Sequence, residues 1–274
     1  MKKVLFRFFL LIVFVGSVGR SANAVDTGGV GVLGGLRREH TCQQGQTYRG
    51  VIFVTNQGSK PAEVKVYQTD YTPLIGGCNY GEPGTAPRSN AQWITFTPQQ
   101  FVIPAGEKIE VFYTISVPDD QNLKGSYWSM LMVEPIQPIS IEKPTVEKGQ
   151  IGASVVSVVR YGILMLTHIG NTGRKELSIV DKQIQEINGK KILFLTVENN
   201  GERLLSCKVW AELFNNEGMS IGRFGQENNY GFYPGCKDQL KIDITGVPSG
   251  EYKALVVLDA GGENVFGAQY DLEL

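Results

Sequence analysis

The segment Val51-Ile-Phe-Val-Thr-Asn-Gln-Gly58, followed by Ala62-Glu-Val-Lys-Val-Tyr67, has the pattern of a strand, an Asn/Gly turn and a second strand. The same pattern returns in the second half of the chain as Ile192-Leu-Phe-Leu-Thr-Val-Glu-Asn-Asn-Gly201 and Leu205-Ser-Cys-Lys-Val-Trp210. A unit that occurs twice in one chain predicts two domains of the same fold.

Apolar and polar residues alternate in both units, as a sheet with one buried face requires. Alternate apolar positions follow a turn in each half: Ile109, Val111, Tyr113, Ile115 and Val117 in the first, and Leu240, Ile242 and Ile244 in the second. This pattern predicts an all-β protein, because the chain also has 33 glycines and few segments rich in the helix-forming residues Ala, Leu, Glu and Lys. We expect two immunoglobulin-like β-sandwich domains, residues 25–170 and 171–274, with the boundary at the turn Gly170-Asn-Thr-Gly-Arg174.

The first 24 residues have the pattern of a cleaved signal peptide. Lys2 and Lys3 precede an apolar stretch from Phe8 to Val15, and Ala22-Asn-Ala24 suits a leader peptidase. A membrane anchor is disfavoured because about fourteen apolar-dominated residues are too few for a span, which needs about twenty. The sequence therefore predicts an exported, periplasmic protein with no membrane span in the mature chain; a cell-surface location is the alternative.

Loss of residues 1–24 changes the formal net charge from −1 to −5, because that segment holds four basic residues and no acidic one. A nucleic-acid partner is excluded, since no basic stripe remains to neutralise phosphates.

Four cysteines in an exported chain predict disulfides. Two lie in each half, so we expect the pairs Cys42–Cys78 and Cys207–Cys236. Each bond would close a loop of about thirty residues and contribute about 3 to 4 kcal/mol. Residues 71–92, rich in Gly, Pro and Asn, are expected to form a long loop that Cys78 pins.

Two segments late in the first half are apolar on both faces, although a sandwich strand buries only one. The strand expected near residues 127–133 carries Trp128, Met130 and Met132 opposite its core face. The segment 151–169 carries apolar residues on both faces: Ile151, Ala153, Val155, Val159, Tyr161, Ile163 and Met165 on one, and Val156, Val158, Leu164 and Leu166 on the other. Five such side chains left in water would forgo about 8 to 15 kcal/mol, so something must cover them. Packing of the second domain, a dimer and a docked strand of another chain all remain open.

The order of these pieces resembles the PapD-like periplasmic pilus chaperones. The resemblance covers most of the mature chain and is carried by "TFTPQQFVIPAGEKIEVFYTISVP", "KGSYWSMLMVEP", "VSVVRYGILMLTHI" and "YPGCKDQLKIDITGVPSGEYKALVVLD". It implies a periplasmic chaperone that lends a strand to an incomplete pilin-like or other surface subunit, with an outer-membrane usher as a second partner.

The resemblance also implies site residues. The candidate donors to the subunit are Ile151, Ala153, Val155 and Val159, beside the apolar surface of Trp128, Met130 and Met132. Arg160, with Arg37 or Arg38, would hold the subunit's terminal carboxylate. The context of the latter pair, Gly34-Gly-Leu-Arg-Arg-Glu-His40, departs from the family's opening pattern.

Other classes of function have weaker signals. A structural or adhesive two-domain surface protein is the alternative, and a carbohydrate-binding module would need an aromatic row that the tryptophans do not form. Gly29-Val-Gly-Val-Leu-Gly34 satisfies a dinucleotide fingerprint but lacks the strand and helix that the motif requires. His40, His168 and the turn carboxylates give no metal-ligand pattern, and no nucleophile elbow occurs. We therefore expect no enzyme, no metal and no cofactor.

Overall fold

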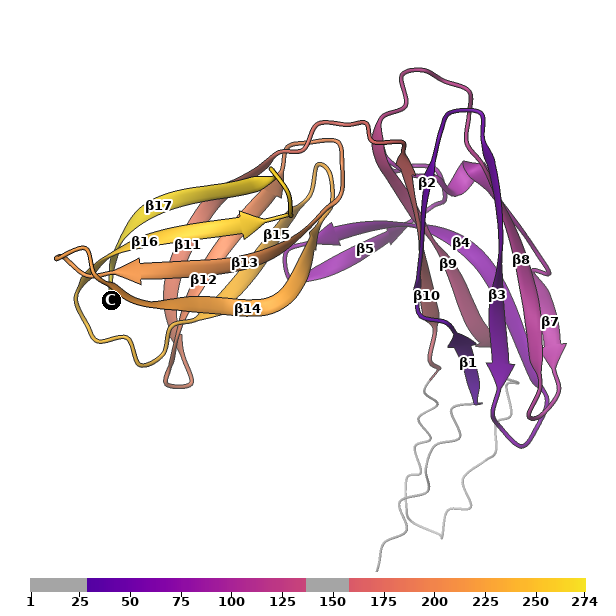
Figure 1. The fold of residues 1–274 in the computed structure, drawn as a ribbon. Helices are drawn as coiled ribbons and strands as arrows, with labels where there is room; N and C mark the ends of the chain where they lie inside the picture. The colour runs from indigo at the N-terminus through magenta and orange to yellow at the C-terminus, as the bar shows by residue number, and fades with distance from the viewer. Residues whose placement is uncertain (1–28, 137–157) are drawn as a thin grey trace, which may run out of the picture.

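The computed structural model describes residues 29–136 and 158–274, and both parts consist of strands apart from one short 3₁₀ turn, η1 (Ala91–Trp93). The strands form two β-sandwiches joined end to end at an angle (Figure 1). The all-β, two-sandwich fold predicted from the alternating pattern is thereby confirmed. The expected signal peptide and the candidate donors Ile151, Ala153 and Val155 lie outside the described residues. Within the described ranges, no helix is long and apolar enough to cross a membrane.

The first sandwich packs a four-stranded sheet against a six-stranded one. The smaller sheet has the order β1 (Val30–Leu33), β3 (Thr47–Asn56), β8 (Lys108–Ser116), β6 (Ile94–Thr97). The larger has the order β2 (Arg37–Cys42), β10 (Tyr161–Ile169), β9 (Gly125–Ile136), β4 (Ala62–Leu74), β5 (Gly77–Gly81), with β7 (Gln100–Ile103) paired to β4. Alternate side chains of both sheets meet in one core, which includes Ile52, Val111, Ile115, Leu131 and Ile163.

The second sandwich has the same two-layer plan. One sheet has the order β11 (Leu177–Ile187), β12 (Lys190–Asn199), β15 (Lys237–Asp243). The other has the order β14 (Ser220–Phe232), β13 (Leu205–Phe214), β16 (Glu251–Asp259), β17 (Val265–Glu273). Its core includes Leu195, Val197, Val209, Leu213 and Val256.

The two Asn/Gly turns confirm that the repeat is structural. The Asn56 amide donates to the carbonyl oxygens of Lys60 and Ile103, at 2.7 and 3.0 Å. The Asn199 amide makes the equivalent bonds in the second sandwich, to Arg203 and Phe232, at 2.9 and 2.8 Å. Both side-chain oxygens accept a backbone N–H two residues on, from Gly58 and Gly201. Both asparagines are almost fully buried, so each turn is held by a satisfied polar group.

The glycine-rich insertion differs from the long loop that the sequence predicted. β4 continues to Leu74 and forms a hairpin with β5. The remainder of the insertion is held by Asp70, whose carboxylate accepts backbone N–H groups from Gly84, Thr85 and Ala86 at 3.1, 2.8 and 2.7 Å. The Ser89 hydroxyl donates to the same carboxylate. A buried aspartate, not Cys78, therefore pins this insertion.

The predicted disulfides are absent, because all four cysteines are free. Cys42 and Cys78 belong to β2 and β5, the opposite edges of the larger sheet. Four strand spacings separate these edges by about 19 Å, far beyond the Cα distance of about 7 Å that a disulfide tolerates. Cys207 is fully buried in the second core, whereas Cys236 lies at the half-buried turn before β15. Sheet order therefore separates Cys42 from Cys78, although both lie in the first half of the chain.

Candidate functional site

β10 has neighbours on both sides over only part of its length. It pairs with β9 from Tyr161 to Ile169, but it pairs with β2 only from Leu164 onward. The Leu164 amide donates to the Leu36 carbonyl across this edge, at 2.9 Å. Alternate residues direct their backbone N–H and C=O groups to the same side of a strand. Gly162 therefore directs both groups to the side on which β2 pairs with Leu164, but β2 has not yet begun at the position of Gly162. Among the described residues, no strand pairs with β10 at that position. The start of β10 is therefore an unfinished sheet edge.

The outer face of the larger sheet carries the apolar side chains that the sequence marked as surplus. Register places Leu166 opposite Trp128, Leu164 opposite Met130 and Gly162 opposite Met132. Tyr67 and Thr69 of β4 lie beside Met132 and Met130. These side chains point away from the first core, because successive residues of a strand face opposite sides.

The second sandwich covers one half of this face. Trp128, Leu164 and Leu166 are 6, 8 and 0% exposed and pack against Leu204, with Tyr233 at their edge. The Trp128 indole N–H donates to the Tyr71 carbonyl at 2.6 Å, and its ring centroid lies 5.0 Å from that of Tyr233. Packing of the second domain, one of the three possibilities that the sequence left open, therefore accounts for this half of the surplus.

Backbone groups also join the two sandwiches. The Ser126 amide donates to the Glu202 carbonyl at 2.9 Å, and the Leu204 amide donates to the Ser126 hydroxyl at 2.8 Å. The Arg203 guanidinium donates to the Gly170 carbonyl at 2.9 Å. Gly125 has φ +77°, and an added Cβ would lie 1.9 Å from the Glu202 carbonyl oxygen, so this close approach requires glycine.

The other half of the face remains open at the start of β10. A pocket of about 310 Å³ is lined by Tyr67, Thr69, Tyr80, Met132, Arg160 and Gly162. The Tyr67 hydroxyl donates to Glu134 at 2.7 Å, and the Arg160 guanidinium lies 3.8 Å from the same carboxylate. Burial raises the pKa of Glu134, but the Tyr67 hydrogen bond and the cations Lys65 and Arg160 outweigh it and lower that pKa overall. Apolar, aromatic and charged groups thus meet at the unfinished edge.

The structure does not bring the three candidate anchor arginines together. Arg37 pairs with Glu39 at 2.8 Å and lies opposite Leu164, about 13 Å along the strand from Arg160. Arg38 points to the other face and donates to the carbonyls of Leu33, Gly34 and Gly35. Its guanidinium therefore caps the turn before β2. Val159, the described candidate donor, is 42% exposed and lies two residues before β10 begins at Tyr161.

Sequence reasoning missed four aromatic and acidic residues of this region: Tyr67, Tyr71, Tyr80 and Glu134. The alternation of Tyr67, Thr69 and Tyr71 was the available signal, because it places all three on one face of β4. Tyr233 was also missed, and no local pattern marks it, since its partners Tyr71 and Trp128 belong to the other domain.

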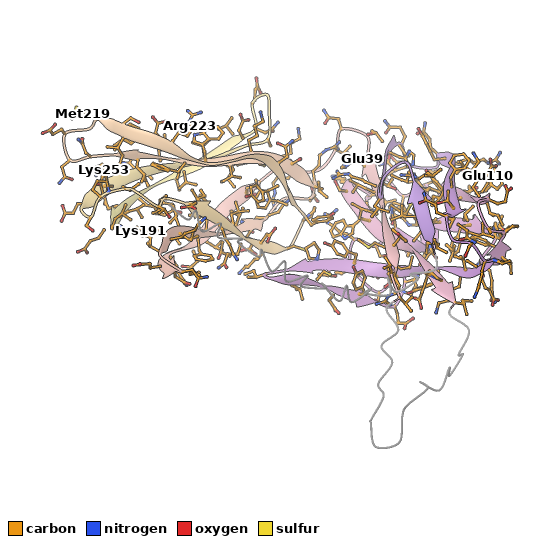
Figure 2. The ribbon with its side chains drawn as sticks, turned by 90° about the horizontal axis from the view of Figure 1, so that it is seen from below. Glu39, Glu110, Lys191, Met219, Arg223 and Lys253 are labelled. Atoms are coloured by element: carbon orange, nitrogen blue, oxygen red, sulfur yellow. The ribbon has the colours of Figure 1, made fainter. Side chains whose placement is uncertain are left out.

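Glu39, His168 and Ser126 form a hydrogen-bonded chain at the joint. The ring nitrogens of His168 lie 2.8 Å from a Glu39 carboxylate oxygen and 2.7 Å from the Ser126 hydroxyl. Glu39 lies on the side of the first sandwich that faces the second (Figure 2). This order matches the acid, base and nucleophile of hydrolases. However, Ser126 is 0% exposed and its oxygen already accepts the Leu204 amide, so the chain holds the domains together and offers no nucleophile.

Burial lowers the pKa of His168, and its hydrogen bond to Glu39 only partly opposes this shift. The unfolded chain therefore takes up a proton near pH 6.5 that the folded chain resists, and stability falls as the pH falls below that value. We expect the free energy of unfolding to decrease from pH 7 to pH 5, by at most about 1.4 kcal/mol per pH unit for this proton. Urea unfolding at a series of pH values measures the slope.

His168→Asn should reduce that slope, because it removes the titrating ring at the joint. His40→Gln measures the share of the other histidine, because burial also lowers the pKa of His40, whose ring contacts Tyr113 and Tyr48. Equal slopes in the wild type and His168→Asn would show that His168 does not couple protonation to folding.

The described residues thus define a two-domain β-sandwich protein whose first sandwich carries an unfinished sheet edge at the start of β10. No family model matches the sequence, and no curated protein matches it.

Solved structures do resemble it. The class 5 fimbriae chaperone CfaA is 14% identical with a TM-score of 0.46, over 88% of this chain and 98% of that chain. The CsuC–CsuE chaperone–tip adhesion subunit pre-assembly complex of Acinetobacter baumannii gives 16% identity and a TM-score of 0.46, over 87% and 97%. The E. coli chaperone DraB is 13% identical with a TM-score of 0.41, over 89% of this chain and 98% of that chain.

Proposed function

We propose that the protein is a periplasmic chaperone that holds exported pilus or surface subunits by strand addition at the start of β10. The observation that carries the proposal is the one-sided pairing of β10 before Leu164. An unpaired strand edge is a template for another chain, since its backbone N–H and C=O groups lack partners. An incoming strand would take the place beside Gly162 that β2 takes beside Leu164.

The side chains around this edge support the same function. Met132 lines the pocket, with 6% of its surface exposed, and flexible thioethers accommodate partners of different shape. Val159 would contribute an apolar contact to the client, together with Ile151, Ala153 and Val155. Arg160 is the remaining candidate for the client's terminal carboxylate, because its side chain is 57% exposed beside the pocket. If Arg37 held this carboxylate instead, the client chain would have to reach about 13 Å further along the sheet than it does to Arg160.

In this function the protein acts by binding, and an outer-membrane usher would receive the complex. Its export to the periplasm rests on the predicted signal peptide. A structural or adhesive surface protein would instead use the same edge to join copies of itself.

Co-expression with a pilin-like subunit tests the proposal. We expect the wild type to copurify with the subunit in a one-to-one complex. Val155→Asp combined with Val159→Asp should reduce capture at least about ten-fold, because each carboxylate must lose water in an apolar contact and 1.4 kcal/mol already gives that factor.

Met219→Asp is the matched control, since Met219 is an exposed apolar residue at the far end of the second sandwich (Figure 2). This control should capture the subunit normally, and all variants should keep the wild-type circular dichroism. Undiminished capture by the folded double variant would argue against the proposal. Self-association without subunit capture would favour the structural alternative.

A further inference from the structure

Gly162 leaves a gap on the outer face of the larger sheet, at the strand edge where a client strand would be added. Leu164 and Leu166, at the next alternate positions of β10, fill the same face with apolar side chains. The φ of Gly162 lies outside the left-handed region, so the backbone of β10 does not itself require glycine there. The missing side chain is therefore a feature of the surface and not of the backbone.

Two thioether sulfurs lie against the space that a side chain at Gly162 would occupy. An added Cβ would lie 3.0 Å from the Met130 Sδ and 3.3 Å from the Met132 Sδ. Both methionines belong to β9, and Met132 is the cross-strand partner of Gly162. A side chain from β10 itself would therefore displace the thioethers and narrow the pocket of about 310 Å³ that Gly162 and Met132 line. The glycine keeps this pocket open at the end nearest the unpaired edge.

The lining of the pocket suits an aromatic ring better than an aliphatic chain. Thioether sulfur attracts the edge of an aromatic ring, and a guanidinium attracts its face. The Arg160 guanidinium stands at the rim with 57% of its side chain exposed, 3.5 Å from the Tyr67 hydroxyl and 3.8 Å from the Glu134 carboxylate. Its face can cover a ring while its edge binds a carboxylate. Tyr67 and Tyr80, on β4 and β5, form the wall farthest from the open edge.

Strand pairing brings one client side chain to this position. Residues directly opposite each other on paired strands project from the same face, with Cβ atoms about 5 Å apart. Because glycine has no side chain of its own, a ring on the adjoining strand can lie across it, and such cross-strand aromatic cover stabilises a glycine in an edge strand. We propose that the client strand carries an aromatic residue opposite Gly162, whose ring lies over the glycine between the thioethers and Arg160. This preference rests on strand addition at β10, the function proposed for the protein, and names the side chain that such addition selects.

Titration of the whole protein with two synthetic strands tests the preference. Both strands alternate threonine with valine around one central residue, which is phenylalanine in one and cyclohexylalanine in the other. Cyclohexylalanine has nearly the same size but no π-electrons. We expect the phenylalanine strand to bind about five-fold more tightly, because only its ring gains the sulfur and guanidinium contacts. Its ring current should also shift the Met132 methyl resonance in the NMR spectrum of the methyl-labelled protein.

Two variants change the two sides of the pocket separately. Gly162→Val should remove the preference for phenylalanine, because its side chain displaces the thioethers. Arg160→Met, at an exposed side chain, should weaken the binding of the phenylalanine strand and leave that of the cyclohexylalanine strand nearly unchanged. Gly231→Val is the matched control, since Gly231 is an exposed strand glycine of β14 whose added Cβ would lie 4.0 Å from the Tyr233 ring, an ordinary contact. This control should keep the wild-type preference.

The outcomes separate the aromatic preference from strand addition itself. Equal affinities of the two strands for the wild type, or a preference that persists in folded Gly162→Val, would overturn the aromatic site and leave strand addition in place. Binding of neither strand, with unchanged amide exchange at residues 158–163, would contradict strand addition at β10, and the aromatic site would fall with it.

Discussion

Trp128→Ala should lower the free energy of unfolding by about 3 to 5 kcal/mol, the range for truncating a large buried aromatic side chain. Trp128 is 6% exposed, and its ring fills the space between the outer face of the larger sheet and Tyr233. Its loss also leaves the Tyr71 carbonyl without the indole donor. Urea unfolding followed by circular dichroism measures the change.

Trp210→Ala is the matched control for this prediction. Trp210 is a half-buried tryptophan of β13 whose ring is stacked under the Arg223 guanidinium, 4.7 Å from its centroid, and it makes no contact with the first sandwich among those described. We expect a clearly smaller loss for Trp210→Ala. Small-angle scattering should show a wider spread of domain angles for Trp128→Ala alone. Equal losses in the two variants, with unchanged scattering, would show that Trp128 does not hold the joint.

Asp70→Ala should cost about 3 to 5 kcal/mol, because it leaves several donors without their buried acceptor. Asp70 is 2% exposed and accepts three backbone N–H groups in addition to the Ser89 hydroxyl. The segment between β5 and η1 should then detach and expose the peptide bond after Arg88 to trypsin. The urea midpoint and the rate of cleavage at Arg88 measure the two effects.

Asp120→Ala is the matched control for Asp70→Ala. Asp120 also accepts a backbone N–H, from Asn122 at 2.9 Å, but in an exposed turn where water can replace the carboxylate. Its removal should change stability by less than about 0.5 kcal/mol. Slow cleavage at Arg88 in a stable Asp70→Ala protein would refute the role given to this carboxylate.

The fold was predictable because its signals are local. Alternation in β8 and β15, and the Asn56 and Asn199 turns, specify a strand and its buried face within a few residues. The surplus of apolar side chains on β9 and β10 was also visible in the sequence, since finding it required only a count of the apolar residues on each face of the strand.

The contacts between distant segments were not predictable. Which half of the apolar face the second sandwich covers depends on Leu204 and Tyr233, whose sequence contexts say nothing of Trp128. The thiol partners depend on sheet order, which separates Cys42 from Cys78 although they lie in one domain. The Glu39–His168 contact joins residues 129 positions apart, so no spacing rule marks it.

Hydrogen–deuterium exchange of the free protein and of its complex with a subunit most directly tests the claim that the start of β10 holds a client strand. The account predicts strong new protection of the Gly162 amide and its neighbours in residues 158–163, because an added strand supplies their missing acceptors. Protection confined to the second sandwich, with unchanged exchange at residues 158–163 in a saturated complex, would contradict it.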